Sequence, residues 1–131
     1  MNVKNYVLGQ WTEGKGTEIE HFHAISGDLI STCSSEGLDY GAILEYGRNT
    51  GSTALRKMTF QQRGEMLKSL ALHLNKRKES FYELSKATGA TRIDSWIDIE
   101  GGIGNLFANA SLRRQFPDLP YHVDGHPAPL S

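Results

Sequence analysis

Cys33 is the sole cysteine of this 131-residue chain and the first residue whose type is suited to catalysis. A thiolate with a base or a helix N-terminus beside it is a nucleophile. Cys33 ends a strand-like run, precedes Ser34 and Ser35, and has no histidine close to it in the sequence. This position favours a small, half-buried strand residue over a catalytic thiol.

Histidines form two groups that resemble parts of metal sites. His21 and His23 have the i, i+2 spacing that places two side chains on one face of a strand. His122 and His126 flank Asp124 in a proline-rich segment near the end of the chain. Neither group has a third ligand at a helpful spacing. We therefore interpret these histidines as solvated polar residues rather than as a metal centre.

The glycine run Gly101-Gly102-Ile103-Gly104 resembles part of a nucleotide-binding loop. The dinucleotide fingerprint needs a preceding strand, a helix that opens at the loop, and a further glycine three residues on. Here the run lies inside a helical pattern and Phe107 occupies the last position, so we do not expect a phosphate loop. Each helical glycine costs roughly 0.5–1 kcal/mol relative to alanine. That cost favours either close approach of another backbone or an open channel beside the helix.

Composition and charge exclude several classes of protein. Fourteen Lys+Arg against fifteen Asp+Glu give a formal charge of −1, which leaves no basic footprint for nucleic acid. One cysteine excludes an internal disulfide framework and a cysteine-based zinc site. No apolar run is long enough to cross a bilayer, and residues 1–10 lack the apolar core of a signal peptide. We therefore expect a soluble, cytoplasmic chain that binds neither nucleic acid nor a membrane.

The elements that must position these residues change type near residue 38. Before it, apolar residues alternate loosely and predict short strands over about 5–33. The runs 19–26 and 29–33 surround Gly27, which predicts a hairpin or a longer loop. After residue 38 the apolar period is helical and predicts helices over about 38–114. Short strands followed by three to four helices indicate an α+β fold class.

Capping signals divide the helical part. The first helix, over 38–46, is expected to break at Gly47 and Gly51. Thr59 and Gln62 have the spacing of a capping box at the start of a long helical stretch.

That stretch is expected to end at Gly89, and a last helix to cover 93–113. Asp94 and Asp98 lie near the positive end of the dipole of this helix. Its apolar residues share one face of the helix. The tail over 115–131 has no periodicity and is expected to be a loop or linker.

Several segments together are similar to the N-terminal part of the aldehyde dehydrogenase superfamily. A strand carries Gly9-Gln10-Trp11, and Arg63 with Leu67 forms the Arg-x-x-x-Leu pattern of the family. Most members have a lysine where this chain has Ala90. That departure and the long run 88–104 resemble a branch of bifunctional ring-opening enzymes in phenylacetate degradation. More modest similarities are His23-Ala24-Ile25-Ser26-Gly27, Ser35-Glu36-Gly37-Leu38-Asp39 and Met58-Thr59-Phe60.

The resemblance implies an α+β fragment of an α/β aldehyde dehydrogenase fold. Whole enzymes of that branch oxidise a CoA-linked semialdehyde to the acid with NADP, and a C-terminal hotdog-fold hydratase domain opens an oxepin ring. Their nucleophilic cysteine, general-base glutamate, oxyanion asparagine and nucleotide-binding strands have no counterpart in 1–131, and Cys33 matches none of them. We therefore expect the N-terminal part of a dehydrogenase domain, with no catalytic or cofactor-binding residues and no activity of its own.

In the superfamily the last of these helices flanks the substrate tunnel. By resemblance, Gly101, Gly102 and Asn105 are candidates for thinning the tunnel wall where a CoA-linked aldehyde passes. Tight helix packing is the other use of these glycines. The expected partners are the remainder of the same polypeptide and further copies in a homo-oligomer. A self-standing assembly or protein-interaction module derived from an aldehyde dehydrogenase is the alternative function, and a small hydrolase that uses Cys33 or the histidines is a third.

Overall fold

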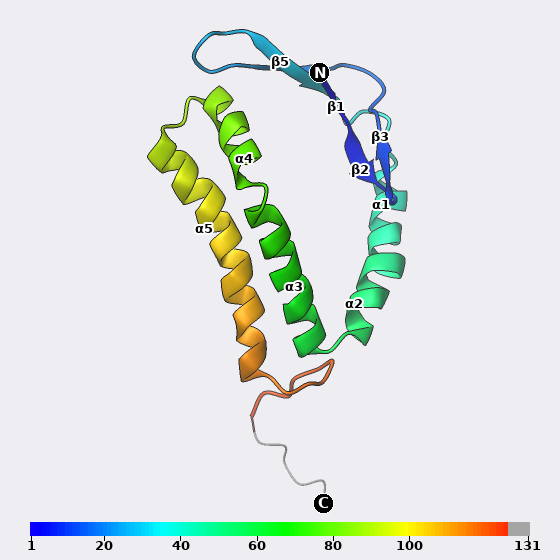
Figure 1. The fold of residues 1–131 in the computed structure, drawn as a ribbon. Coiled ribbons are helices and arrows are strands. Elements are labelled where there is room, and N and C mark those ends of the chain that lie inside the picture. The colour runs from blue at the N-terminus through cyan, green and yellow to red at the C-terminus, as the bar shows by residue number, and fades with distance from the viewer. Residues whose placement is uncertain (126–131) are drawn as a thin grey trace, which may run out of the picture.

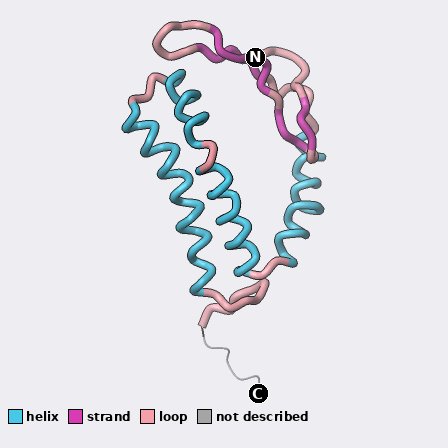
Figure 2. Tube along the Cα trace, viewed as in Figure 1, coloured by secondary structure: helices cyan, strands magenta, loops and turns pink. Residues whose placement is uncertain are grey.

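A computed structural model describes residues 1–125 as a small α+β chain in which short strands precede the helices (Figures 1 and 2). The helices of the second half lie side by side, and one sheet crosses their end (Figure 1). This order confirms the α+β class expected from the alternating and helical apolar periods.

The larger sheet joins three strands in the order β1-β5-β4. β1 (Asn2–Val3) runs parallel to β5 (Leu29–Cys33), and β4 (Ile19–Phe22) runs antiparallel to β5. The predicted hairpin around Gly27 is therefore confirmed, with a six-residue connection between Phe22 and Leu29. β1 was not expected, because two residues are too few to show an alternating pattern.

The second sheet is the hairpin of β2 (Asn5–Val7) and β3 (Gln10–Thr12). Its two-residue turn places Leu8 at φ 52° and Gly9 at φ 80°. Positive φ at both central positions is the geometry of a type I′ turn, which glycine adopts without strain.

The first helical rod is longer than the sequence predicts. α1 (Tyr40–Tyr46) continues through a π-helical segment, η1 (Gly47–Ser52), into α2 (Thr53–Lys57). The α-helix does end at Tyr46, as predicted, but the chain stays helical through Gly47 and Gly51 instead of breaking there. Gly47 has ordinary helical angles, φ −58° and ψ −43°. Glycine permits a break in a helix without imposing one. Here the segment Gly47–Ser52, which is rich in poor helix formers, forms a wider π-helical turn instead.

α3 (Phe60–Asn75) begins with the predicted capping box. The Thr59 hydroxyl accepts from the Gln62 amide, and the Gln62 side chain accepts from the Thr59 amide at 2.9 Å. Two otherwise unpaired amides at the helix start are satisfied in this way.

α4 (Lys78–Ser85) follows α3 and tightens into a 3-10 turn, η2 (Lys86–Thr88). Gly89 then adopts the left-handed conformation at φ 79°, which confirms the predicted end of the helical stretch. The turn at Gly89 reverses the chain so that the next helix runs back along α4 and α3 (Figure 1).

α5 (Arg92–Ser111) starts with a second capping box, formed by Thr91 and Asp94, and ends in η3 (Leu112–Gln115). Asp94 thus lies at the positive end of the α5 dipole, as the sequence indicated. A Cβ on Gly64 of α3 would lie 2.5 Å from Cδ of Arg113, so glycine allows α3 and the end of α5 to approach closely.

Few side chains are buried in the described residues. The expected apolar face of the last helix is only partly covered: Ile103 is buried, whereas Ile93, Trp96 and Ile97 are 70%, 55% and 59% exposed. Residues 1–125 therefore leave the first two turns of this face largely uncovered. The buried apolar residues are Ala71, Tyr82, Ile103 and Ala110, and the buried polar ones are Ser31, Ser34 and Ser95.

The accessible surface of the chain is large for its mass. It amounts to 9931 Å² for 14.5 kDa. A folded monomer of that mass exposes about 6,900 Å², so the chain exposes about 3,000 Å² more than a self-sufficient domain. Much of the apolar surface of the helices has no covering element among residues 1–125.

The described part of the tail has no helix or strand after Gln115, as expected, but it is not a free linker. The Gln61 amide donates to the carbonyls of Arg113 (2.8 Å) and Phe116 (3.2 Å). The Phe116 ring stacks on Phe60 with ring centroids 4.5 Å apart. These contacts hold the tail against the start of α3.

Candidate functional site

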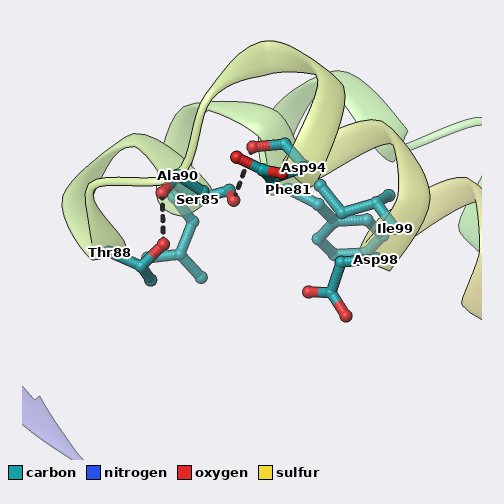
Figure 3. Close-up of a pocket in the computed structure, with 9 residues that line it drawn as sticks. Phe81, Ser85, Thr88, Ala90, Asp94, Asp98 and Ile99 are labelled. Carbon is teal, nitrogen blue, oxygen red and sulfur yellow. Dashed lines mark hydrogen bonds between the residues drawn. The ribbon is translucent and has the colours of Figure 1, made fainter.

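One pocket lies between α4 and α5, beside the turn at Gly89 (Figure 3). We call it the α4–α5 pocket; its volume is about 340 Å³. Its lining residues are Phe81, Leu84, Ser85, Thr88, Ala90, Asp94, Ser95, Asp98 and Ile99.

Hydroxyl groups satisfy one another at the back of this pocket. The Ser85 and Ser95 side chains share a 2.8 Å hydrogen bond that joins α4 to α5. The Thr88 hydroxyl donates to the Ser85 carbonyl at 2.8 Å (Figure 3). The Asp94 carboxylate accepts from both the amide and the hydroxyl of Thr91, at 3.2 and 2.6 Å. Asp98 has no hydrogen-bond partner in residues 1–125, and its side chain is exposed.

A charged cluster next to the pocket fixes the spacing of α4 and α5. The Tyr82 hydroxyl and the Lys78 ammonium both donate to Oε1 of Glu100, at 2.8 and 3.1 Å. The Arg92 guanidinium lies 3.6 Å from the centre of the Tyr82 ring, a cation–π contact.

The same contacts shift two pKa values in opposite directions. The hydrogen bond from Tyr82, followed by that from Lys78, lowers the pKa of Glu100. Burial, followed by the hydrogen bond to Glu100, raises the pKa of Tyr82. Both shifts favour the same pair, a neutral phenol donating to an ionised carboxylate.

The three tunnel candidates lie on the open side of α5. A Cβ added to Gly101 or Gly102 would meet no atom within 4 Å in the described part of the chain. Gly104 has the same open surroundings, and Asn105 is exposed. Packing among residues 1–125 therefore does not explain these glycines. Whether they line a substrate passage stays a prediction.

The structure brings Cys33 and His21 together, which the sequence alone did not show. Nε2 of His21 lies 3.1 Å from Sγ of Cys33, across neighbouring strands β4 and β5. His23 is engaged elsewhere, because its Nδ1 accepts from the amides of Ile25 and Ser26. His21 and His23 thus do not converge on one point.

The second histidine group is also spread out. His122 lies 3.5 Å from Asp124, whereas His126 lies outside the described residues. Within residues 1–125, no three His, Cys, Asp or Glu side chains cluster as metal ligands would.

A second pocket, of about 270 Å³, lies between α3 and the end of α5. Arg63 lines it, stacks on Phe60 at 4.3 Å and donates to the Pro120 carbonyl at 3.2 Å. Arg63 thus belongs to the contacts that hold the tail. The sequence singled out Arg63 only as part of a family pattern and gave no signal for this role.

Sequence reasoning also missed the α4–α5 pocket. The sequence indicates Asp94 and Asp98 only as charges near a helix end, and it does not single out Ser85 or Ser95. A serine within a helix gives no signal for its partner, because the pair forms between two helices.

Comparison with known proteins gives one informative relative. No family model matches the chain. Over 104 residues, the chain is 33% identical to a 3,4-dehydroadipyl-CoA semialdehyde dehydrogenase from Aromatoleum evansii. The match covers 79% of this chain and 20% of that protein.

This chain is related to the aldehyde dehydrogenases. The match agrees with the resemblance to aldehyde dehydrogenases that the sequence motifs indicated. The chain spans about one fifth of the length of the curated relative that it matches. No helix in residues 1–125 combines the length and apolar character of a membrane span.

Proposed function

We propose that this chain is the N-terminal segment of an enzyme that oxidises a CoA-linked semialdehyde to the acid. The observation that carries the proposal is the 33% identity to a CoA-semialdehyde dehydrogenase over 79% of the chain. The large bare surface supports it, since about 3,000 Å² beyond that of a self-sufficient domain calls for more polypeptide. The catalytic groups would then belong to other parts of the enzyme.

The nicotinamide cofactor, proposed as NADP, also belongs to those other parts. A dinucleotide loop needs glycines between a strand and the start of a helix. Here Gly101, Gly102 and Gly104 lie in the middle of α5. The described residues therefore do not fit a nucleotide site, and we assign none of them to the cofactor.

We further propose the finer assignment to phenylacetate degradation, with an oxepin-CoA ring-opening hydratase domain on the same polypeptide and a homo-oligomeric, cytoplasmic enzyme. This part rests on the resemblance of the run 88–104 and on the substitution at Ala90. Activity on an oxepin-CoA substrate by the native gene product tests it separately from the dehydrogenase reaction.

Within the whole enzyme, the proposed task of this segment is to form one wall of the substrate passage. The passage wall would be thin on the open side of α5, because Gly101, Gly102 and Asn105 place little side-chain bulk there. Such a wall leaves room for the wide CoA-linked chain to reach the reacting centre. The wall itself does not contact the aldehyde carbon.

Gly102→Leu in the native gene product tests the passage. We expect a lower kcat/KM for a CoA-linked semialdehyde and little change for a short aldehyde, because only the bulky chain needs the open wall. Gly47→Leu is the matched control, since Gly47 is also helical and open. Unchanged kinetics with the CoA-linked substrate, in a stably folded Gly102→Leu variant, would refute the passage but leave the dehydrogenase assignment intact.

A further inference from the structure

The connection between β4 and β5 is held by the side chain of its first residue, His23. Nδ1 of this imidazole accepts hydrogen bonds from the amides of Ile25 and Ser26, at 3.2 and 3.3 Å. The backbone closes the same connection through a 2.8 Å bond from the His23 amide to the Asp28 carbonyl. We call residues 23–28 the His23 turn. Its inner amides are satisfied only while Nδ1 is an acceptor.

This turn also attaches the strands to the helices. The Ala24 amide donates to the Ala87 carbonyl of η2 at 2.9 Å. Within residues 1–125, no other backbone hydrogen bond joins the strand region, residues 1–36, to the helices from α3 onward. The two parts also pack closely here, because a Cβ on Gly89 would lie 3.4 Å from the Ala24 Cβ. Figure 1 shows the sheet crossing the end of the helices at this place.

Only a neutral imidazole can hold the turn in this way. A neutral histidine has one ring nitrogen that carries a proton and one that accepts, whereas both nitrogens donate in the imidazolium. A proton on Nδ1 of His23 would face the amide protons of Ile25 and Ser26 with no acceptor between them. Both amides would then turn to water, which is close because both residues are exposed. Histidine is the side chain that ordinarily changes charge between about pH 5 and 8.

The charged groups around the His23 turn do not compensate a proton on the ring. Oδ2 of Asp28, the carboxylate of the turn itself, accepts from the Ser26 hydroxyl at 2.6 Å. Among residues 1–125, no carboxylate forms an ion pair with His23. The charged residues at the helix ends beside the turn are bonded to one another or to the backbone: Glu83 with Lys86, Glu79 with Arg92, and Asp94 with the Thr91 amide.

We propose that His23 makes the attachment of the strands to the helices pH-dependent. Protonation of its imidazole opens the His23 turn and releases the hydrogen bond from Ala24 to Ala87. The reason is geometric, since Ala24 lies between His23 and the two amides that its ring orients. The helices keep their own contacts, such as the Ser85–Ser95 bond, which contain no histidine. This inference concerns the contact between strands and helices and stands independently of the reaction proposed above.

Hydrogen–deuterium exchange of the native gene product tests the proposal, read by mass spectrometry on peptides that cover residues 22–29. Exchange is compared at about pH 8 and about pH 5, the two ends of the range in which histidine titrates, after correction for the intrinsic pH dependence of amide exchange. We expect about tenfold less protection of this segment in acid, because two hydrogen bonds of ordinary strength are lost. Peptides from α3 should show little change.

Three variants assign the effect to Nδ1 of His23. His23→Asn places a carbonyl oxygen where Nδ1 lies, and asparagine side chains accept from amides two residues on in such turns. Asparagine does not titrate, so protection should no longer depend on pH. His23→Ala removes the acceptor and should show, already at about pH 8, the weak protection of the parent in acid. His21→Asn is the matched control, since His21 contacts Cys33 instead of the turn and should leave the pH dependence intact.

Three results would overturn the proposal. Equal protection of residues 22–29 in the parent at both ends of the pH range would remove the pH dependence. A loss of protection in acid that persists in His23→Asn would assign it to another group, such as Asp28. Strong protection in His23→Ala, or weak protection in His23→Asn, at the alkaline end would mean that an acceptor at this position does not hold the turn. None of these results depends on dehydrogenase activity, so the two proposals fail separately.

Discussion

The Tyr82 hydroxyl donates a 2.8 Å hydrogen bond to Glu100 and thereby joins α4 to α5 at the level of the α4–α5 pocket. Tyr82 is 2% exposed, so its hydroxyl has little access to water as an alternative partner. A buried polar group that loses its partner is costly. Loss of this contact should therefore cost more stability than loss of an exposed ion pair such as that of Arg92 with Glu79.

Tyr82→Phe removes the hydroxyl and keeps the ring under Arg92. We expect a lower unfolding midpoint, because the partly buried Glu100 carboxylate loses its closest donor. Urea unfolding followed by circular dichroism measures the change. Tyr121→Phe is the matched control, since Tyr121 is 62% exposed and should be indifferent to the same change. Equal midpoints for Tyr82→Phe and the parent chain would contradict this role.

Stability should decline in acid through Glu100. Its pKa is lowered in the folded chain, chiefly by the hydrogen bond from Tyr82, so the folded state favours the ionised carboxylate more than the unfolded state does. The resulting stabilisation is complete above the ordinary glutamate pKa and is lost as pH falls through the lower, folded pKa. Glu100→Gln should thus be less stable than the parent at pH 7, with the gap closing in acid. A gap that stays constant with pH would argue against the shift.

Two glycine substitutions should have opposite signs. Gly64→Ala places a Cβ 2.5 Å from Cδ and 2.8 Å from Cβ of Arg113, and overpacking of this kind costs about 1–3 kcal/mol. Gly104→Ala meets no atom within 4 Å in the described residues and should raise helix stability by about 0.5–1 kcal/mol. Unfolding free energies of the 131-residue variants give both values. A destabilising Gly104→Ala would mean that its side of α5 is already covered.

The hold on the tail should depend on Gln61. Gln61→Ala removes both hydrogen bonds to the carbonyls of Arg113 and Phe116. We expect faster limited proteolysis by chymotrypsin after Tyr121, because the tail then separates from α3 more often. Gln115→Ala serves as the control, since Gln115 is exposed and its side chain makes no hydrogen bond in the described structure. Equal cleavage rates in both variants would mean that the Phe60–Phe116 stack suffices.

The sequence predicted those parts of the fold that local chemistry determines. The capping box of Thr59 and Gln62 and the left-handed Gly89 are signals within a few residues of the element they end. The sequence did not predict that the chain stays helical through Gly47, and the reason is related. A glycine shows where a chain is free to break, and the decision depends on what the neighbouring residues do.

Contacts between elements were beyond sequence reasoning. The Ser85–Ser95 bond, the His21–Cys33 contact and the pocket around Asp98 each join residues ten or more positions apart or on different helices. The spacing of apolar residues likewise predicts which of them share a helix face, but it does not predict whether another element covers that face. Trp96 and Ile97 show this, because they lie in a clear helical pattern and remain more than half exposed.

The intact mass of the native gene product tests the central claim, that this chain is one segment of a larger dehydrogenase. Mass spectrometry of the product purified from its source gives the value directly, for comparison with the 14.5 kDa of this chain. We expect a product several times heavier that contains this sequence. A native product of 14.5 kDa would contradict it and leave a self-standing interaction module as the function to be explained.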